Sequence, residues 1–174
     1  MSLLNRLFGS PGPDPKVRLL SLYDQIVAKA REPHWYVEGQ VPDSIDGRFD
    51  MVSAVLALVL MRLEDSADHS PDMARLTEVF VDDMDGQMRE AGIGDVIVGK
   101  HIGKMMSALG GRLAAFRAAR TDATLLDSAI LRNIYRTETV SPDALSHVRE
   151  QILLLDRSLA TQVPEKIVEG AIQW

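Results

Sequence analysis

The stretch DGRFDMVSAVLALVLMRLE, residues 46–64, decides the fold because nearly all of its positions are apolar. With 3.6 residues per helical turn, its apolar side chains cover both sides of a helix. One side carries Phe49, Val52, Leu56, Val59, Leu60 and Leu63, and the opposite side carries Met51, Ala54, Leu58 and Met61. A helix that is apolar all round is typical of the centre of a helical bundle. Its longest apolar run, residues 51–61, is too short to span a bilayer, which takes about 20 residues.

The rest of the chain repeats apolar residues at a helical period and contains no convincing strand. We therefore predict an all-α, single-domain bundle of about six helices with a mostly apolar central helix. The expected helices cover residues 15–31, 46–64, 70–91, 95–119 and 123–136, and the sixth opens at Ser141 and Pro142. Residues 15–162 form the helical domain in this interpretation. Residues 163–174 are a tail that packs back on the domain or is partly mobile.

Residues 1–14 are expected to form a flexible or amphipathic N-terminal segment. Leu3, Leu4, Leu7 and Phe8 fall on one helical face, which either folds onto the core or makes a weak contact with a membrane surface. The segment has one basic residue and no long apolar region, so it does not resemble a secretory signal.

Composition narrows the possible functions. The chain has 174 residues, a net charge of −6 and no cysteine. A disulfide framework and a thiolate metal site are therefore excluded. The negative charge argues against DNA or general nucleic-acid binding. No cofactor is expected.

The methionines of the central helix allow a second interpretation. Methionine has an unbranched, polarizable side chain that adapts to varied apolar surfaces. If the side with Met51, Leu58 and Met61 were open, it would line a groove for an apolar partner. The favoured interpretation remains that the whole helix is core.

An acidic segment follows in FVDDMDGQMREAGIGD, residues 80–95. On the expected third helix, Asp83 lies at the edge of a methionine-bearing apolar face, whereas Asp82 and Asp85 point away. Asp83 needs a polar partner if it is buried, and Arg48 or a lysine of the fourth helix is expected to supply it. The string DDMDG does not place acids where a calcium-binding loop requires them, because Val81 and Gly92 occupy the end positions of that loop.

The fourth expected helix carries an unusual row of small residues. The row is Gly99, Gly103, Ser107, Gly110 and Ala114. Each glycine inside a helix costs about 1 kcal/mol relative to alanine, so the row needs a reason. We expect a neighbouring helix of the same chain to approach closely along it, and a partner protein is the alternative.

Nothing in the sequence supports an active site. The four histidines lack the spacing of a paired metal site, and no nucleophile or phosphate-loop motif occurs. Asp43, Asp46 and Asp50 surround a helix start, where carboxylates favour the positive end of the helix dipole. We interpret these acids as capping residues and expect a protein without catalytic activity.

Three blocks carry a family resemblance. They are Trp35-Tyr36, then VPDSIDGRFDMV at residues 41–52, then FVDDMDGQMREAGIGD at residues 80–95. Their order and spacing resemble the ubiquinol–cytochrome c chaperone family over roughly residues 19–120. The resemblance implies an all-helical, non-enzymatic assembly factor that binds newly made cytochrome b and promotes assembly of the bc1 complex.

The resemblance also implies partners and a location. The implied client is an apolar membrane protein, with the ribosome or a small partner protein as further contacts. The His-Trp pair that mitochondrial members carry early in the second helix is replaced here by Ala54-Val55. Together with the missing targeting extension, this implies a bacterial protein that is cytoplasmic or peripheral at the inner membrane.

The matching positions supply further candidates for partner binding beside Met51, Leu58 and Met61. They are Trp35, Tyr36, Asp46, Arg48, Phe49, Asp82, Asp83, Asp85, Arg89 and Glu90. Two alternatives stay open. One is a small-ligand-binding protein or enzyme that uses the acidic and aromatic residues around Trp35 and Asp83. The other is a structural subunit that docks through the glycine row of the fourth helix.

Overall fold

The computed structural model describes residues 15–90, 92, 94–136 and 139–174, and all regular structure in these ranges is helical. This confirms the predicted fold class. The α-helices are α1 (Pro15–Ala30), α2 (Ile45–Glu64), α3 (Ser70–Glu90), α4 (Asp95–Thr121), α5 (Leu126–Asn133), α6 (Pro142–Thr161) and α7 (Pro164–Val168). Short 3-10 turns, η2 (Pro33–Trp35), η3 (Ala67–His69) and η4 (Ala123–Leu125), lie in the connections.

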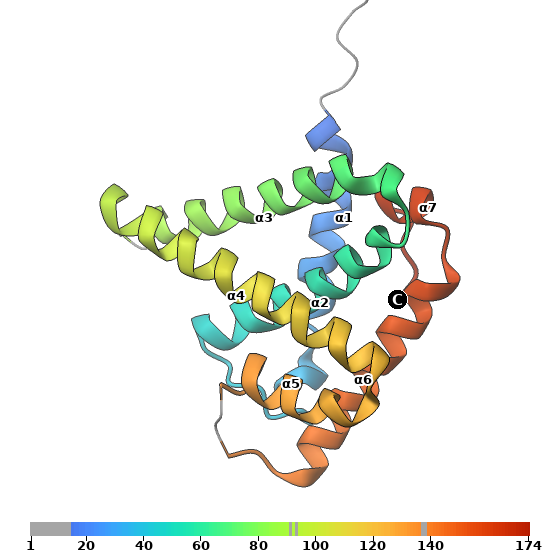
Figure 1. Cartoon of the computed structure of the whole chain (residues 1–174). Coiled ribbons are helices and arrows are strands. Elements are labelled where there is room, and N and C mark those ends of the chain that lie inside the picture. Colours follow the sequence, from blue (N-terminus) through green and yellow to red (C-terminus); the bar gives the residue numbers. More distant parts are fainter. Residues whose placement is uncertain (1–14, 91, 93, 137–138) are drawn as a thin grey trace, which may run out of the picture.

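Helix α2 is the centre of the bundle. It contacts α1, α3, α4 and α6, which surround it in Figure 1. Every residue from 51 to 61 is buried. Met51, Leu58 and Met61 expose no more than 2% of their surface. The interpretation of this side as an open groove is therefore wrong, and α2 is core all round.

The start of α2 is fixed by a cap and by a close backbone approach. The Ser44 hydroxyl accepts a hydrogen bond from the Gly47 amide at 3.1 Å. A Cβ atom at position 47 would lie 1.9 Å from the carbonyl oxygen of Pro42. Only glycine fits there, so the chain can fold sharply from the η2 connection into the central helix.

Helices α3 and α4 form a long pair whose joined ends project to one side of the molecule (Figure 1). The apolar side of α3 faces the core, with Leu76 and Phe80 fully buried and Met84 and Met88 nearly so. The helix ends at Glu90, and Gly92 follows with a left-handed φ of 80°. Gly92 thus lies at the position just past the helix where glycine favours the left-handed conformation that ends it.

The glycine row of α4 lies open. Gly99, Gly103 and Gly110 are exposed, and a Cβ atom added at any of them would meet nothing within 4 Å. The expected close approach of a helix from the same chain is wrong. The neighbours of α4 pack instead on its other side, through residues such as Leu109 and Phe116.

The fifth helix is shorter than expected. Residues 123–125 form the turn η4, α5 ends at Asn133, and Tyr135 lies buried in the following connection, where its hydroxyl donates to the Gly39 carbonyl. Arg136 has a left-handed φ of 52°.

The tail from residue 163 packs back on the bundle and contains the short helix α7. Its side chains Ile167, Val168 and Ile172 are buried in the common core. Gln25 of α1 donates a hydrogen bond of 2.6 Å to the Gly170 carbonyl, which ties the tail to the first helix. Residues 1–14, with the expected amphipathic face, lie outside the described residues.

No helix in the described ranges is both long enough and apolar enough to cross a membrane.

Candidate functional site

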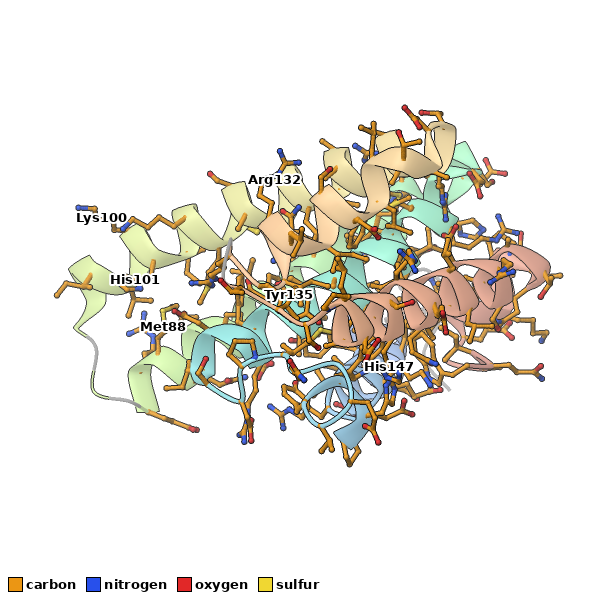
Figure 2. All side chains as sticks on the ribbon, turned by 90° about the horizontal axis from the view of Figure 1, so that it is seen from below. Met88, Lys100, His101, Arg132, Tyr135 and His147 are labelled. Atoms are coloured by element: carbon orange, nitrogen blue, oxygen red, sulfur yellow. The ribbon has the colours of Figure 1, made fainter. Side chains whose placement is uncertain are left out.

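A groove lined by methionines opens between α1, α2, α3 and α4. It has a volume of about 250 Å³. Its apolar lining, which we call the methionine groove, consists of Val27, Ile45, Phe49, Val52, Met84, Met88 and Met105, and its polar rim of Arg31, Arg48, Asp83 and Gln87. The methionines thus come from α3 and α4, and not from the central helix, whose methionines were the alternative candidates for such a groove. Figure 2 places Met88 near the projecting end of the α3–α4 pair.

Aromatic packing holds the floor of the groove. The ring centroid of Phe49 lies 5.9 Å from that of Phe80, and the Tyr23 ring meets Phe80 edge-on at 6.5 Å. Such pairs contribute stabilisation beyond the area they bury. The floor is therefore a fixed apolar surface, whereas the methionines along the groove are the adaptable part.

Asp83 is held on the groove rim by partners other than those expected. Its carboxylate accepts hydrogen bonds from the Tyr23 hydroxyl at 2.7 Å and from the Gln87 amide at 3.0 Å. Burial and the neighbouring Asp83 carboxylate raise the pKa of Tyr23 far above its usual value, so its hydroxyl stays a donor. Arg48 binds Asp43 at 2.6 Å, so the expected pairing of Asp83 with Arg48 is wrong, and no described lysine of α4 pairs with Asp83 either.

A second depression continues from the groove across Arg31 and Arg48. It has a volume of about 380 Å³ and is also lined by Pro33, Tyr36, Val37 and Asp43. We call it the side hollow. Tyr36 donates to the Ala30 carbonyl at 3.0 Å, which fixes its ring on this wall. Val37 beside the hollow and Ile45 beside the groove are 69% and 86% exposed, so both apolar side chains are open to solvent.

The structure brings Tyr36, Arg48, Phe49 and Asp83 together around these two depressions. It does not bring the other candidates there. Trp35 is fully buried and donates from its ring nitrogen to the Lys29 carbonyl at 2.9 Å, so it supports the connection from within.

The remaining acidic candidates lie away from the groove lining. Arg89 pairs with Asp85 at 2.6 Å one helical turn away, and Asp82 and Glu90 are exposed. The Asp83 carboxylate already accepts hydrogen bonds from Tyr23 and Gln87, and Trp35 is fully buried. The structure therefore gives no support to a ligand site or active site built on these two residues.

A buried ion cluster lies on the other side of Phe49, and the sequence analysis missed it. Asp50 is 2% exposed and accepts from Arg112 at 2.9 Å and from Arg136 at 2.6 Å. Asp46 also pairs with Arg136, at 2.9 Å. The interpretation of Asp50 as a capping residue is therefore wrong. The overlooked signal was Arg112, which falls between Leu109 and Phe116 on the buried side of α4.

Two histidines meet away from the groove. His34 Nδ1 lies 3.0 Å from His147 Nε2, and His34 Nε2 lies 3.0 Å from Glu32. This contact joins the η2 connection to α6. Among the described residues, no group of three or more histidine or acidic side chains is placed to hold a metal ion.

Comparisons with known proteins agree with the resemblance found in the sequence. The model of the ubiquinol–cytochrome c chaperone family matches residues 37–174. The crystal structure of the Cbp3 homolog from Brucella abortus is similar to this chain, with a TM-score of 0.79 and 31% sequence identity over 92% of this chain and 90% of the other. A search of curated proteins finds no significant match. The family match covers most of the sequence and the structural likeness extends over nearly all of it, so this chain belongs to the ubiquinol–cytochrome c chaperone family.

Proposed function

We propose that this protein is an assembly chaperone for ubiquinol–cytochrome c reductase and that its client is newly made cytochrome b. Family membership supports the general role. The observation that carries the mechanism is the methionine groove, an adaptable apolar surface on a protein whose central helix is closed.

The groove suits an apolar helix or loop of a membrane protein before it reaches its final partners. Such a segment exposes side chains that water solvates poorly, and a methionine-lined surface accepts side chains of different shapes. The protein therefore does not need a single sequence to recognise its client. This is the mode in which an apolar helix face lies in a hydrophobic groove.

The size of the groove favours release as well as binding. A volume of about 250 Å³ accepts only a few side chains, so a long segment is held by a few anchors while the rest stays outside. Exposed Val37 and Ile45 extend the apolar contact, and Arg31 and Arg48 on the rim offer charge to polar ends of the segment. A client held this way leaves readily when a reductase subunit buries the same side chains.

Site-specific crosslinking tests the groove directly. A photoreactive amino acid replaces Ile45, which is exposed beside the groove, or Leu154, an exposed residue of α6 that is 52% accessible. Cytochrome b is then synthesised in cells that contain one of the two variants. We expect a crosslink to cytochrome b from position 45 and none from position 154. Equal crosslinks from the two positions would show that the groove is not the binding site.

A deletion strain tests the function itself. We expect loss of assembled reductase on a native gel and recovery when the wild-type gene is returned. Ile45→Glu should restore assembly poorly, because a charge enters the apolar groove, whereas Leu154→Glu should restore it fully. Both positions are exposed, so neither change disturbs the core. Normal reductase in the deletion strain would refute the proposed function.

The family resemblance also supports a cytoplasmic location, peripheral to the inner membrane, with the ribosome or a small partner protein as further contacts. These finer assignments are part of the proposal. Fractionation of cell extracts tests the location, and sedimentation with translating ribosomes tests the ribosome contact.

A further inference from the structure

A cationic pocket lies beside the methionine groove, on the other side of Phe49 and Met105, which line both depressions. Its volume is about 360 Å³. Its basic lining residues are Lys104, Arg112, Arg132 and Arg136, together with His101. They come from α4 and from α5 with its following residues, two segments that pack against each other.

The carboxylates of this pocket are already engaged. Asp50 forms ion pairs with both Arg112 and Arg136, and Asp46 forms an ion pair with Arg136. These four groups balance one another in charge. Lys104 and Arg132 make no ion pair or hydrogen bond with any described residue, so the lining carries two uncompensated positive charges at neutral pH. This surplus is notable in a chain whose net charge is −6.

The floor of the pocket holds a guanidinium with unused hydrogen-bonding capacity. The Arg112 side chain is only 2% exposed, and its Nη2 atom donates to Asp50 at 2.9 Å and to the Asn133 carbonyl. Its Nε and Nη1 atoms are buried without a hydrogen-bond partner in the described part of the chain. Burial lowers the pKa of Arg112, which reflects the cost of desolvating its charge. A second anion near this group would offset that cost.

We propose that this pocket binds a phosphate group, either as the inorganic ion or as the head group of an anionic phospholipid. Arginine presents its donors in a rigid fork and lysine supplies a compact charge, and the two together suit a tetrahedral oxyanion. The cations converge on one hollow and do not form a stripe, which favours a single phosphate over a nucleic-acid backbone. The shared wall of Phe49 and Met105 places the bound phosphate next to the methionine groove.

A pair of matched double variants tests the pocket. Lys104→Gln with Arg132→Gln removes the two unpaired charges. Lys100→Gln with Arg157→Gln removes the same charge from exposed positions outside the pocket. Lys100, Lys104 and Arg132 make no hydrogen bond or ion pair with the described residues, and Arg157 donates only to a carbonyl of its own helix. Both double variants should therefore fold normally. Thermal unfolding of each variant checks this.

Inorganic phosphate is the first probe. Amide NMR spectra of the full chain are recorded as phosphate is added at constant ionic strength, with chloride as the reference anion. We expect shifts at residues around 104, 112 and 132, and at least a tenfold weaker Kd in the pocket variant than in the surface variant. This factor corresponds to about 1.4 kcal/mol.

Vesicles distinguish the two sources of phosphate. The proteins are floated with vesicles of phosphatidylglycerol or of phosphatidylcholine. Flotation with phosphatidylglycerol alone, reduced in the pocket variant more than in the surface variant, would assign the site to a lipid head group. Phosphate binding without such flotation would assign it to the free ion. If neither probe distinguishes the pocket variant from the surface variant, the proposal is overturned, whatever the outcome of the cytochrome b experiments.

Discussion

At the scale of single residues, Asp50 illustrates how a buried charge is tolerated. Its position near a helix start suggested a capping role, but the side chain is enclosed and holds two guanidinium groups. Removing charges from water is costly, and good geometry with several hydrogen bonds only balances that cost. The cluster fixes α2 against α4 and stabilises the left-handed backbone of Arg136. It specifies how these elements meet more than it adds to stability.

Although the intact cluster adds little to stability, removal of only one of its charges should be strongly destabilising, as in Asp50→Asn. The change leaves the enclosed Arg112 guanidinium without its carboxylate, and we expect the free energy of unfolding in urea to fall by about 3–5 kcal/mol. Adding Arg112→Met should recover part of that loss, because the uncompensated charge is then gone. Asp43→Asn is the matched control, since Asp43 is exposed and pairs with exposed Arg48, and its effect should be small. Equal effects of the two Asp→Asn changes would contradict this account.

The contacts of individual side chains were the part that the sequence predicted least well. Arg48 or a lysine of the fourth helix was expected to reach Asp83. Arg48 instead binds Asp43, five residues away, because the fold of residues 42–47 brings Asp43 back beside the helix. Tyr23, whose hydroxyl donates a hydrogen bond to Asp83 instead, is 60 residues away in sequence. Helical periodicity places a residue on a face of its own helix, but it does not state which helix lies opposite that face.

At the scale of elements, the ends of helices were predictable where a cap or glycine marks them. Ser44 and Ser141 each accept a hydrogen bond from the backbone amide of the third residue of the helix, and Gly92 follows the end of α3. The start of α5 was misplaced. There the Asp122 carboxylate accepts from the Thr124 amide at 3.0 Å and caps a 3-10 turn. Hydrogen bonds from the Thr124 hydroxyl and then from its amide lower the pKa of Asp122. A side chain that hydrogen-bonds to the backbone in this way competes with the regular helix without changing the spacing of apolar residues, so that spacing did not reveal the true start of α5.

Glycines in two elements should respond to alanine in opposite directions. Gly103 is exposed within α4 and has open space at its Cβ position, so Gly103→Ala should stabilise the protein by up to about 1 kcal/mol. Gly47→Ala would place a methyl group against the Pro42 carbonyl and should destabilise it by about 1–3 kcal/mol. Thermal and urea unfolding of both variants measure the difference. A loss of stability in Gly103→Ala would show that the glycine row is packed in the isolated protein.

At the scale of the whole molecule, the fold separates a closed core from an open working surface. The central helix, recognised from sequence as apolar all round, is covered by its neighbours, and the methionines that line the groove lie on the projecting α3–α4 pair. The sequence identified the core because hydrophobic pattern alone determines burial of such a helix. It did not locate the groove, because a groove depends on how far α3 and α4 diverge from α1 and α2.

The tail completes the same core from the opposite end of the chain. Residues 163–174 bury Ile167, Val168 and Ile172 in the common core, where α7 contacts α1, and Gln162 donates to the Gln173 carbonyl at 2.6 Å. Each buried aliphatic side chain contributes about 1.5–3 kcal/mol. A chain that ends at Gln162 should therefore lose about 5 kcal/mol or more of unfolding free energy and expose the apolar surface of α1.

Urea unfolding and binding of a hydrophobic dye measure the effect of this truncation. We expect a lower urea midpoint and stronger dye fluorescence than in the full chain. Ile167→Ala should reproduce part of the loss, whereas Lys166→Ala, which alters an exposed neighbour on the same short helix, should leave the midpoint almost unchanged. A truncated chain with the full-length midpoint would mean that the core is complete at residue 162 and that the tail only covers it.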